Sequence, residues 1–125
     1  MQNFSWPSDW MRAALSLCVL KALDGGATYG YAIASRLEQQ GFGEVRGGTL
    51  YPLLTRLESA GWVTVSWQAG DGGPGRKYFS LTTAGRRELA GQSDLWTRFA
   101  GTVGSFLDNE GHHEHISRRS LHDSP

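Results

Sequence analysis

Residues 47–62 constrain the fold most, because they predict one short helix with both of its ends marked. Gly48 or Thr49 is suited to the N-cap, and Pro52 falls in the first turn, where its missing N–H costs little. Gly61 follows the last apolar position and is suited to the residue just after a helix end. Four leucines at intervals of three and four residues form one face of this helix: Leu50, Leu53, Leu54 and Leu57. Such a face packs on a core, so the rest of the chain must supply one.

The opposite face of this helix has the size and chemistry to enter a DNA major groove. It is small, hydroxylated and singly basic, and it consists of Tyr51, Pro52, Thr55, Arg56 and Ser59. An arginine there can bind guanine or a phosphate through two parallel hydrogen bonds. We therefore interpret the segment as a recognition helix. Three alternatives stay open: Tyr51 packing on the preceding helix, Arg56 pairing with a carboxylate, and Thr49 acting as a cap, a DNA reader or both.

Two alternating segments after this helix predict a β-hairpin. Apolar and polar residues alternate over residues 63–68 and again over residues 76–81, a period of two that indicates strands. Between them, residues 69–75 are too rich in glycine to form anything but a turn. A hairpin beside a recognition helix would bring Arg76 and Lys77 to DNA phosphates. If the alternation holds, one of these two side chains points away from the DNA.

Two further helices are expected before the recognition helix. The first starts at Ser8 as N-cap and is apolar around most of its circumference, which is typical of a helix buried between other elements or at a subunit interface. The second runs from Tyr29 to about Gln40 and is stopped by Gly41. Three helices followed by a hairpin make a winged helix-turn-helix, a mainly α (α+β) fold with a two-stranded β-hairpin wing.

A long helix is expected over residues 83–108, capped by Thr82 or Thr83. It carries a broad apolar stripe that nothing later in the chain can cover, and an apolar face of that size needs a partner. The simplest partner is a second copy of the chain, which gives a two-fold homodimer. The expected dimer contacts are Leu15, Leu95, Trp96, Phe99, Val103 and Phe106. Gly101 and Gly104 leave open whether this helix is continuous.

The aromatic part of this stripe also suits a flat ligand. Trp96, with Trp10 or Phe99, could line a cavity between two subunits and stack on a small aromatic or drug-like molecule. Packing in a core or a dimer interface is the simpler interpretation of the same residues. No other cofactor is expected.

Charge and composition exclude several classes of protein. Seven basic and four acidic residues give +3 over residues 36–87, and two basic and four acidic residues give −2 over residues 108–125, within a formal net charge of +0. Cys18 is the only cysteine, so no disulfide can form within the chain. The apolar run of residues 13–23 is too short to span a bilayer, so a cytoplasmic protein without a membrane partner is expected.

No catalytic or metal site is expected. All four histidines lie in residues 109–125, a polar tail expected to be disordered, so a serine or cysteine elsewhere has no obvious base. His112, His113 and His115 could chelate a metal, but no ordered scaffold is expected around them. The glycines at 70–75 lack the following lysine and hydroxyl residue of a phosphate-binding loop. The chain is therefore not expected to be an enzyme.

Three blocks of the sequence resemble the PadR family of transcriptional regulators, in the order and spacing of that family. They lie in residues 20–33 with Thr28-Tyr29-Gly30-Tyr31, in residues 48–61 with Gly48-Thr49-Leu50-Tyr51-Pro52, and in residues 75–85 with Gly75-Arg76-Lys77-Tyr78. Together they cover roughly residues 13–90. The single long helix that follows resembles the smaller PadR subgroup.

The resemblance implies a bacterial homodimer that binds a double-stranded DNA operator with two-fold symmetry. It implies repression of transcription that a small aromatic or drug-like ligand relieves, and a long helix that packs on the first helix of the partner. The expected organisation is a DNA-binding domain at 1–82 with an N-terminal arm at 1–7, a dimerisation helix at 83–108 and a tail at 109–125. The expected DNA contacts are Thr49, Tyr51, Pro52, Thr55, Arg56, Ser59, Arg76 and Lys77. The alternative function is a winged-helix module that binds a protein partner without sequence-specific DNA binding; the salt dependence of DNA affinity would distinguish the two.

Overall fold

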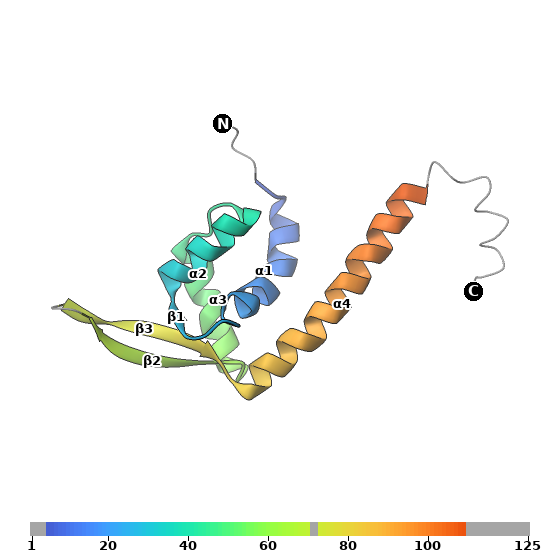
Figure 1. Cartoon of the computed structure of the whole chain (residues 1–125). Coiled ribbons are helices and arrows are strands. Elements are labelled where there is room, and N and C mark those ends of the chain that lie inside the picture. The colour runs from blue at the N-terminus through green and yellow to red at the C-terminus, as the bar shows by residue number, and fades with distance from the viewer. Residues whose placement is uncertain (1–4, 71–72, 110–125) are drawn as a thin grey trace. The chain divides into compact units, whose positions relative to one another are not determined.

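The structure is a computed structural model that describes residues 5–70 and 73–109. It is mainly helical with one small antiparallel sheet (Figure 1). The chain divides into two compact units, residues 1–91 and 92–125. Of the expected tail at 109–125, the structure describes only Asn109. The histidines at 112, 113 and 115 lie outside the described residues.

The elements follow the expected winged-helix order, with additions. They are α1 (Ser8–Ala22), β1 (Thr28–Tyr29), α2 (Gly30–Leu37), the π-helical turn η1 (Glu38–Phe42), α3 (Gly47–Ser59), β2 (Val63–Gly70), β3 (Gly73–Leu81) and α4 (Thr83–Asp108). The long C-terminal helix is present, and α4 is continuous through both glycines that left its continuity open. No helix in the described part of the chain is long and apolar enough to cross a membrane.

The recognition helix starts earlier than the sequence predicted. Arg46, rather than Gly48 or Thr49, occupies the N-cap of α3, and its carbonyl oxygen accepts hydrogen bonds from the backbone N–H of Thr49 at 3.0 Å and of Leu50 at 2.9 Å. Ser8 is likewise the first residue of α1 and not its cap, because Pro7 holds that position. Neither N-cap residue forms a capping hydrogen bond through its side chain. Gly47 and Gly48 adopt helical geometry, so the N-cap lies two or three residues before the predicted position.

The C-terminal end of α3 forms as the sequence predicted. Gly61 has a φ of 84°, the left-handed conformation that favours glycine. Its N–H donates to the carbonyl oxygen of Glu58 at 2.9 Å, and the N–H of Trp62 donates to that of Leu57 at 3.1 Å. These two bonds form a Schellman motif, which closes the helix and turns the chain into β2.

The sheet has three strands rather than the two of the predicted hairpin. Strand order is β1-β3-β2, and both pairs are antiparallel. In the short pair, Thr28 lies opposite Phe79 and Tyr29 opposite Tyr78. β1 was missed because two residues cannot display a period of two. The strands of the hairpin also extend further into the glycine-rich turn than predicted, to Gly70 and from Gly73.

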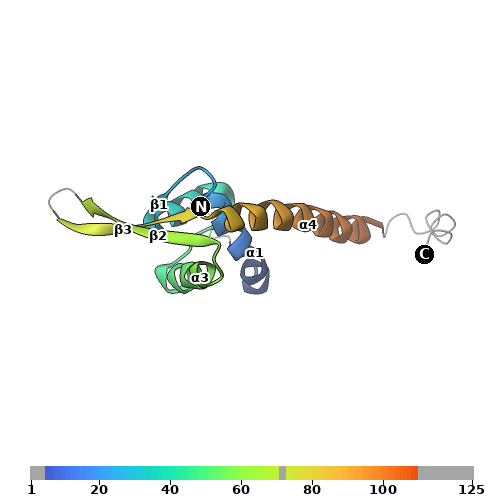
Figure 2. The same cartoon turned by 90° about the horizontal axis from the view of Figure 1, so that it is seen from below.

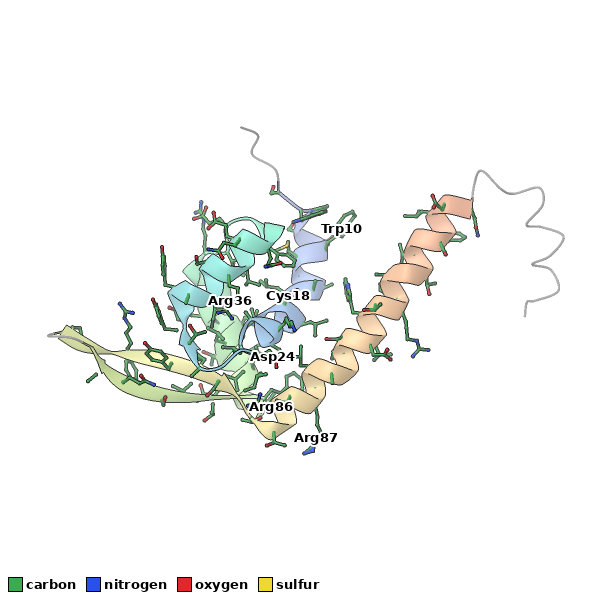
Figure 3. All side chains as sticks on the ribbon, viewed as in Figure 1. Trp10, Cys18, Asp24, Arg36, Arg86 and Arg87 are labelled. Carbon is green, nitrogen blue, oxygen red and sulfur yellow. The ribbon has the colours of Figure 1, made fainter. Side chains whose placement is uncertain are left out.

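The second helix is shorter than predicted. α2 ends at Leu37, and the chain continues as η1, in which Gly41 has a φ of 104°. The indole N–H of Trp6 donates to the carbonyl oxygen of Gly41 at 2.9 Å, which attaches the N-terminal segment to this turn. Arg36, near the end of α2, donates through Nη1 to the carbonyl oxygen of Ala22 at 2.6 Å and so caps α1 (Figure 3).

The core of the first unit is built where the leucine pattern placed it. All four leucines of α3 are buried, and they meet apolar residues of α1, α2, β2 and β3 in one cluster. No charged or polar side chain is buried in the described part of the chain. The core therefore holds α3 by apolar packing alone and leaves its polar side exposed.

A tight joint connects the end of α3 to the start of α4. Thr82 donates through its hydroxyl to the carbonyl oxygen of Gly61 at 2.7 Å and through its N–H to that of Trp62 at 3.0 Å. The Thr82 hydroxyl also accepts from the N–H of Gly85 at 2.9 Å, so Thr82 caps α4 as predicted. A Cβ added to Gly85 would overlap the carbonyl oxygen of Trp62. Glycine at this position is what allows the two main chains to come so close.

Candidate nucleic-acid interface

The outer face of α3 is exposed and polar, as a DNA-reading face requires. Pro52, Thr55 and Ser59 are all exposed on it. The hydroxyl of Thr55 donates to the carbonyl oxygen of Tyr51 at 3.0 Å, so it faces an outside partner mainly as an acceptor. Because α3 begins at Gly47, Pro52 lies in the second turn and not the first. The carbonyl oxygen of Gly48 therefore receives no hydrogen bond from position 52.

Tyr51 combines the two roles that the sequence left open. Its ring covers Gly30, the first residue of α2, where an added Cβ would overlap the hydroxyl oxygen and lie 2.5 Å from Cζ. The side chain is nevertheless 47% exposed. Tyr51 thus packs on α2 and also presents polar surface beside the outer face of α3. Its hydroxyl is held in place by a contact that only glycine permits.

The wing presents its two cations on opposite faces of the hairpin. The guanidinium of Arg76 lies 4.4 Å from the centre of the Tyr29 ring, and the Lys77 ammonium lies 5.6 Å from the centre of the Phe79 ring. The described residues of β2 and β3 include no acidic side chain. In Figure 2 the distal part of this hairpin extends beyond the helices. The wing can therefore meet an anionic surface with either face.

An exposed tryptophan on the wing was not singled out by the sequence reading. Trp67 lies opposite Lys77 in the strand register and is 70% exposed. Strand alternation puts it on the same face of β2 as Val63, which is in the core, and Val65, which packs against the core. The core does not extend as far along the hairpin as Trp67. The alternation in a sequence shows which side chains lie on the same face of a strand, but it does not show how far along the strand the core extends.

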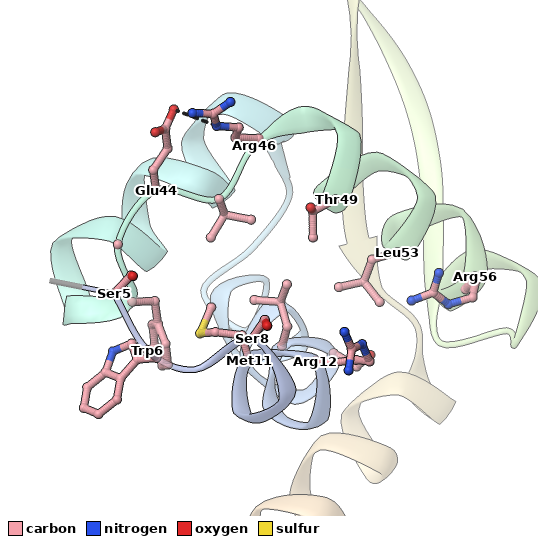
Figure 4. Close-up of a pocket in the computed structure, with 15 residues that line it drawn as sticks. Ser5, Trp6, Ser8, Met11, Arg12, Glu44, Arg46, Thr49, Leu53 and Arg56 are labelled. Atoms are coloured by element: carbon pink, nitrogen blue, oxygen red, sulfur yellow. Dashed lines mark ion pairs between the residues drawn. The ribbon is translucent and has the colours of Figure 1, made fainter. Parts of the chain in front are cut away.

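A cleft of about 750 Å³ lies between α1, α3 and the segment that precedes α3 (Figure 4). Met11 and Leu15 of α1 and Leu53 of α3 contribute apolar surface to it. Three arginines line it as well: Arg12 from α1, Arg46 at the N-cap of α3, and Arg56 from α3. Arg12 was not among the DNA contacts predicted from the sequence. Nothing in the local pattern indicates that it faces the recognition helix.

The second unit exposes the apolar stripe of α4. The exposed side chains on this helix include Leu95, Trp96, Phe99, Val103 and Phe106. The Trp96 and Phe99 rings meet edge to face, with centroids 6.0 Å apart. Leu15, expected as a dimer contact, is instead only 6% exposed and belongs to the core of the first unit. Trp10 also belongs to the first unit, where its ring centroid lies 6.4 Å from that of Trp6.

Comparison with known proteins decides which class of protein carries this geometry. Residues 19–91, which include the whole of α3 and both strands of the wing, match the "Transcriptional regulator PadR-like family". The chain belongs to this family. Membership makes it a PadR-type transcriptional regulator, which is a class of DNA-binding protein and not of enzymes.

Individual proteins are similar to this chain over different shares of their length. The chain is 36% identical over 81 residues to the transcriptional regulator Rv3488 of Mycobacterium tuberculosis, covering 65% of this chain and 74% of that protein. It is 36% identical over 87 residues to a 37.1 kDa protein in transposon TN4556 of Streptomyces fradiae, covering 70% of this chain but only 24% of that protein. A solved PadR family transcriptional regulator from Eggerthella lenta is 33% identical, with a TM-score of 0.74, over 82% of this chain and 89% of that one.

The PadR match accounts for the first unit and leaves other groups without an assigned role. Cys18 is half-buried in α1 (Figure 3), and burial raises the pKa of its thiol, which disfavours the reactive thiolate. No group of three histidine, cysteine or acidic side chains suited to a metal ion occurs among the described residues. The DNA-contact residues predicted within α3 and the wing remain predictions, now with known positions.

Proposed function

We propose that this PadR-like protein is a cytoplasmic homodimer that binds an operator with two-fold symmetry and represses transcription from it. The observation that carries the proposal is the apolar stripe on α4, where Leu95, Phe99 and Phe106 are each more than half exposed. A helix that exposes aromatic and aliphatic side chains at three-and-four spacing gains free energy by pairing with another apolar surface. A second copy of the same helix offers that surface and closes the assembly by symmetry.

Dimerisation also compensates for the small number of polar groups that the outer face of α3 can offer to DNA. The outer face of α3 supplies a few hydroxyl groups and the phenol of Tyr51, with a single arginine at its flank. A single copy of such a helix binds DNA weakly. Two copies placed in successive major grooves, about 34 Å apart, would bind as one ligand, and each wing would add contacts to phosphates.

The effector proposed for this repressor is a small planar aromatic molecule. Trp96 and Phe99 already form an edge-to-face pair on the exposed stripe. In a two-fold dimer the same pair occurs twice around the axis, so that a flat molecule could stack between the copies. A ligand that binds one spacing of the recognition helices better than another shifts the population toward that spacing and weakens operator binding.

The test combines mass, DNA binding and ligand release. Size-exclusion chromatography with light scattering should give twice the 13.7 kDa mass of the chain. A gel shift with the protein's own promoter should show one complex, which planar cationic drugs dissociate while they quench tryptophan fluorescence. A monomeric species, or binding that does not distinguish the promoter from random DNA, would refute the proposal. Equal quenching in Trp96→Ala would refute the ligand site alone.

A further inference from the structure

The two walls of the cleft between α1 and α3 each carry an arginine. Arg56 projects from α3 and Arg12 from α1, and Figure 4 shows both away from the end where Glu44 lies. Glu44 forms an ion pair with Arg46, with Oε2 3.7 Å from Nε. The lining holds three arginines and one glutamate, which is a net charge of +2. The cleft is therefore an electropositive site with its positive end between two helices.

The two guanidinium groups at this end are poorly compensated. None of the ion pairs among the described residues involves Arg56. Arg12 pairs with Asp9 at 2.6 Å on its own helix, but the two side chains are 73% and 86% exposed. An exposed pair of that kind contributes little and is readily exchanged for a better anion. Thr49 and Ser16 line the same cleft and add hydroxyl donors.

The position of the cleft indicates which anion it receives. Arg46, Thr49, Leu53 and Arg56 recur every three or four residues, so they form one flank of α3, beside its outer face. When a recognition helix lies in a major groove, the phosphate strands that border the groove run along the flanks of that helix. The flank toward α1 is the one that carries arginines. A strand passing there would meet Arg56 on one side and Arg12 on the other.

We propose that Arg12 and Arg56 form a clamp on one backbone phosphate of bound DNA. Guanidinium groups suit this task because each can give two parallel hydrogen bonds to a phosphate. The clamp makes α1 part of the DNA interface and assigns to Arg56 a positioning contact rather than base reading. The inference rests on the proposed DNA binding and adds one contact to it. Because the contact is independent of sequence, it forms on any duplex.

The test measures how affinity depends on salt. Binding to a fluorescein-labelled 30-base-pair duplex of random sequence is followed by anisotropy from low to physiological salt, for wild type and Arg12→Gln. Each phosphate contact contributes about 0.9 to the slope of log affinity against log salt. Because Arg56 still holds the phosphate in this variant, Arg12→Gln should lower the magnitude of the slope by at most about that amount per protomer and weaken binding about tenfold. An unchanged slope would overturn the proposal.

A matched control excludes a general loss of charge. Arg98 on α4 is 72% exposed and pairs with Asp94 one turn earlier, much as Arg12 pairs with Asp9. Arg98→Gln should leave the slope at its wild-type value, and a decrease equal to that of Arg12→Gln would overturn the assignment. Arg12→Lys, which keeps the charge, should retain most of the slope. Circular dichroism melting should confirm that these exposed substitutions leave the fold intact.

The double variant tests whether the two arginines hold the same phosphate. If each acts alone, the fold losses of Arg12→Gln and Arg56→Gln multiply in the double variant. The clamp predicts that the fold loss of the double variant differs clearly from that product. A fold loss within twofold of the product would overturn the clamp. A free anion is the competing occupant. Stabilisation of the DNA-free protein by inorganic phosphate, lost in Arg12→Gln, would reassign the cleft to small anions.

Loss of the clamp and loss of the proposed function give different results. If wild type binds its promoter no better than the random duplex, specific operator recognition fails, while the Arg12 effect on the random duplex can still be measured. If wild type binds its promoter specifically and Arg12→Gln changes nothing on either duplex, only the clamp fails.

Discussion

The contact between Tyr51 and Gly30 makes a sharp prediction for the substitution Gly30→Ala. A Cβ at position 30 would lie 2.5 Å from Cζ of Tyr51 and 2.9 Å from Cε1. Ordinary van der Waals contact begins near 3.4 Å and the hydroxyl oxygen lies closer than Cζ, so the side chain must retreat by more than 0.9 Å, which is 3.4 minus 2.5. The backbone at Gly30 is ordinary for a helix start and accepts alanine. The strain therefore falls on the tyrosine.

The cost to stability should be small because Tyr51 can move. Its side chain is 47% exposed, so it can rotate toward solvent rather than push on the core. Overpacking of a rigid site costs about 1–3 kcal/mol, and we expect a free energy of unfolding lower by about 1 kcal/mol at most. Gly30→Ala should reduce DNA affinity more clearly than it reduces the free energy of unfolding. Loss of one phenol hydrogen bond of about 1 kcal/mol lowers affinity about fivefold for each recognition helix.

The measurement is a double-mutant cycle with Tyr51→Ala. Urea unfolding followed by circular dichroism gives stability, and fluorescence anisotropy with a promoter duplex gives affinity. In the Tyr51→Ala background, Gly30→Ala should have no further effect on affinity, since the displaced group is already absent. Gly91→Ala serves as the control, because nothing lies within 4 Å of its added Cβ. If Gly30→Ala weakens binding equally with and without Tyr51, the tyrosine is not the group through which position 30 acts.

Three further predictions concern other parts of the chain. Gly85→Ala must displace the main chain of Trp62, whose carbonyl carbon would be 2.9 Å away; it should lower the free energy of unfolding by about 2 kcal/mol or more, while Gly91→Ala should raise it by up to about 1 kcal/mol in the same urea titration. Phe106→Asp removes a side chain that is 74% exposed in one chain; it should raise the dimer dissociation constant more than about a hundredfold in sedimentation experiments, while the neighbouring Ser105→Asp, on the other side of α4, should not. Burial raises the pKa of Cys18; the unfolded thiol loses its proton first as pH rises above about 8.5, so stability should fall there, and Cys18→Ala should abolish that fall in pH-dependent melting.

The recognition helix shows how far local pattern reaches. The spacing of its leucines predicted the buried face, and all four are in the core. Gly61 predicted the end of the helix because its conformation is a local property. The N-cap was predicted two or three residues too late, because two glycines allow either a cap or helical geometry and the choice depends on what packs next to them. The hairpin was predicted for the same reason as the leucine face, since alternation is visible within one strand.

Features that depend on distant segments could not be predicted. α1 is apolar around most of its circumference, so periodicity cannot show which side faces the core, and Leu15 was assigned to the wrong surface. β1 exists only because β3 lies beside it. Arg12 faces α3 through a tertiary arrangement that no spacing in the sequence records. The candidate site therefore mixes residues found by local pattern on α3 and the wing with one found only by placing two helices together.

The joint formed by Gly61, Thr82 and Gly85 has a consequence for how such a regulator can diversify. Its contacts are main chain to main chain or main chain to a single hydroxyl, so it tolerates almost no change of residue type. Apart from Tyr51, which packs on Gly30, the outer face of α3 has no such restriction, because its other side chains are exposed. Substitutions on this face can therefore change which DNA sequence α3 binds without changing the joint that connects α3 to α4. We expect new DNA-binding specificities to arise in this fold by substitutions on the outer face of α3, while the joint formed by Gly61, Thr82 and Gly85 stays unchanged.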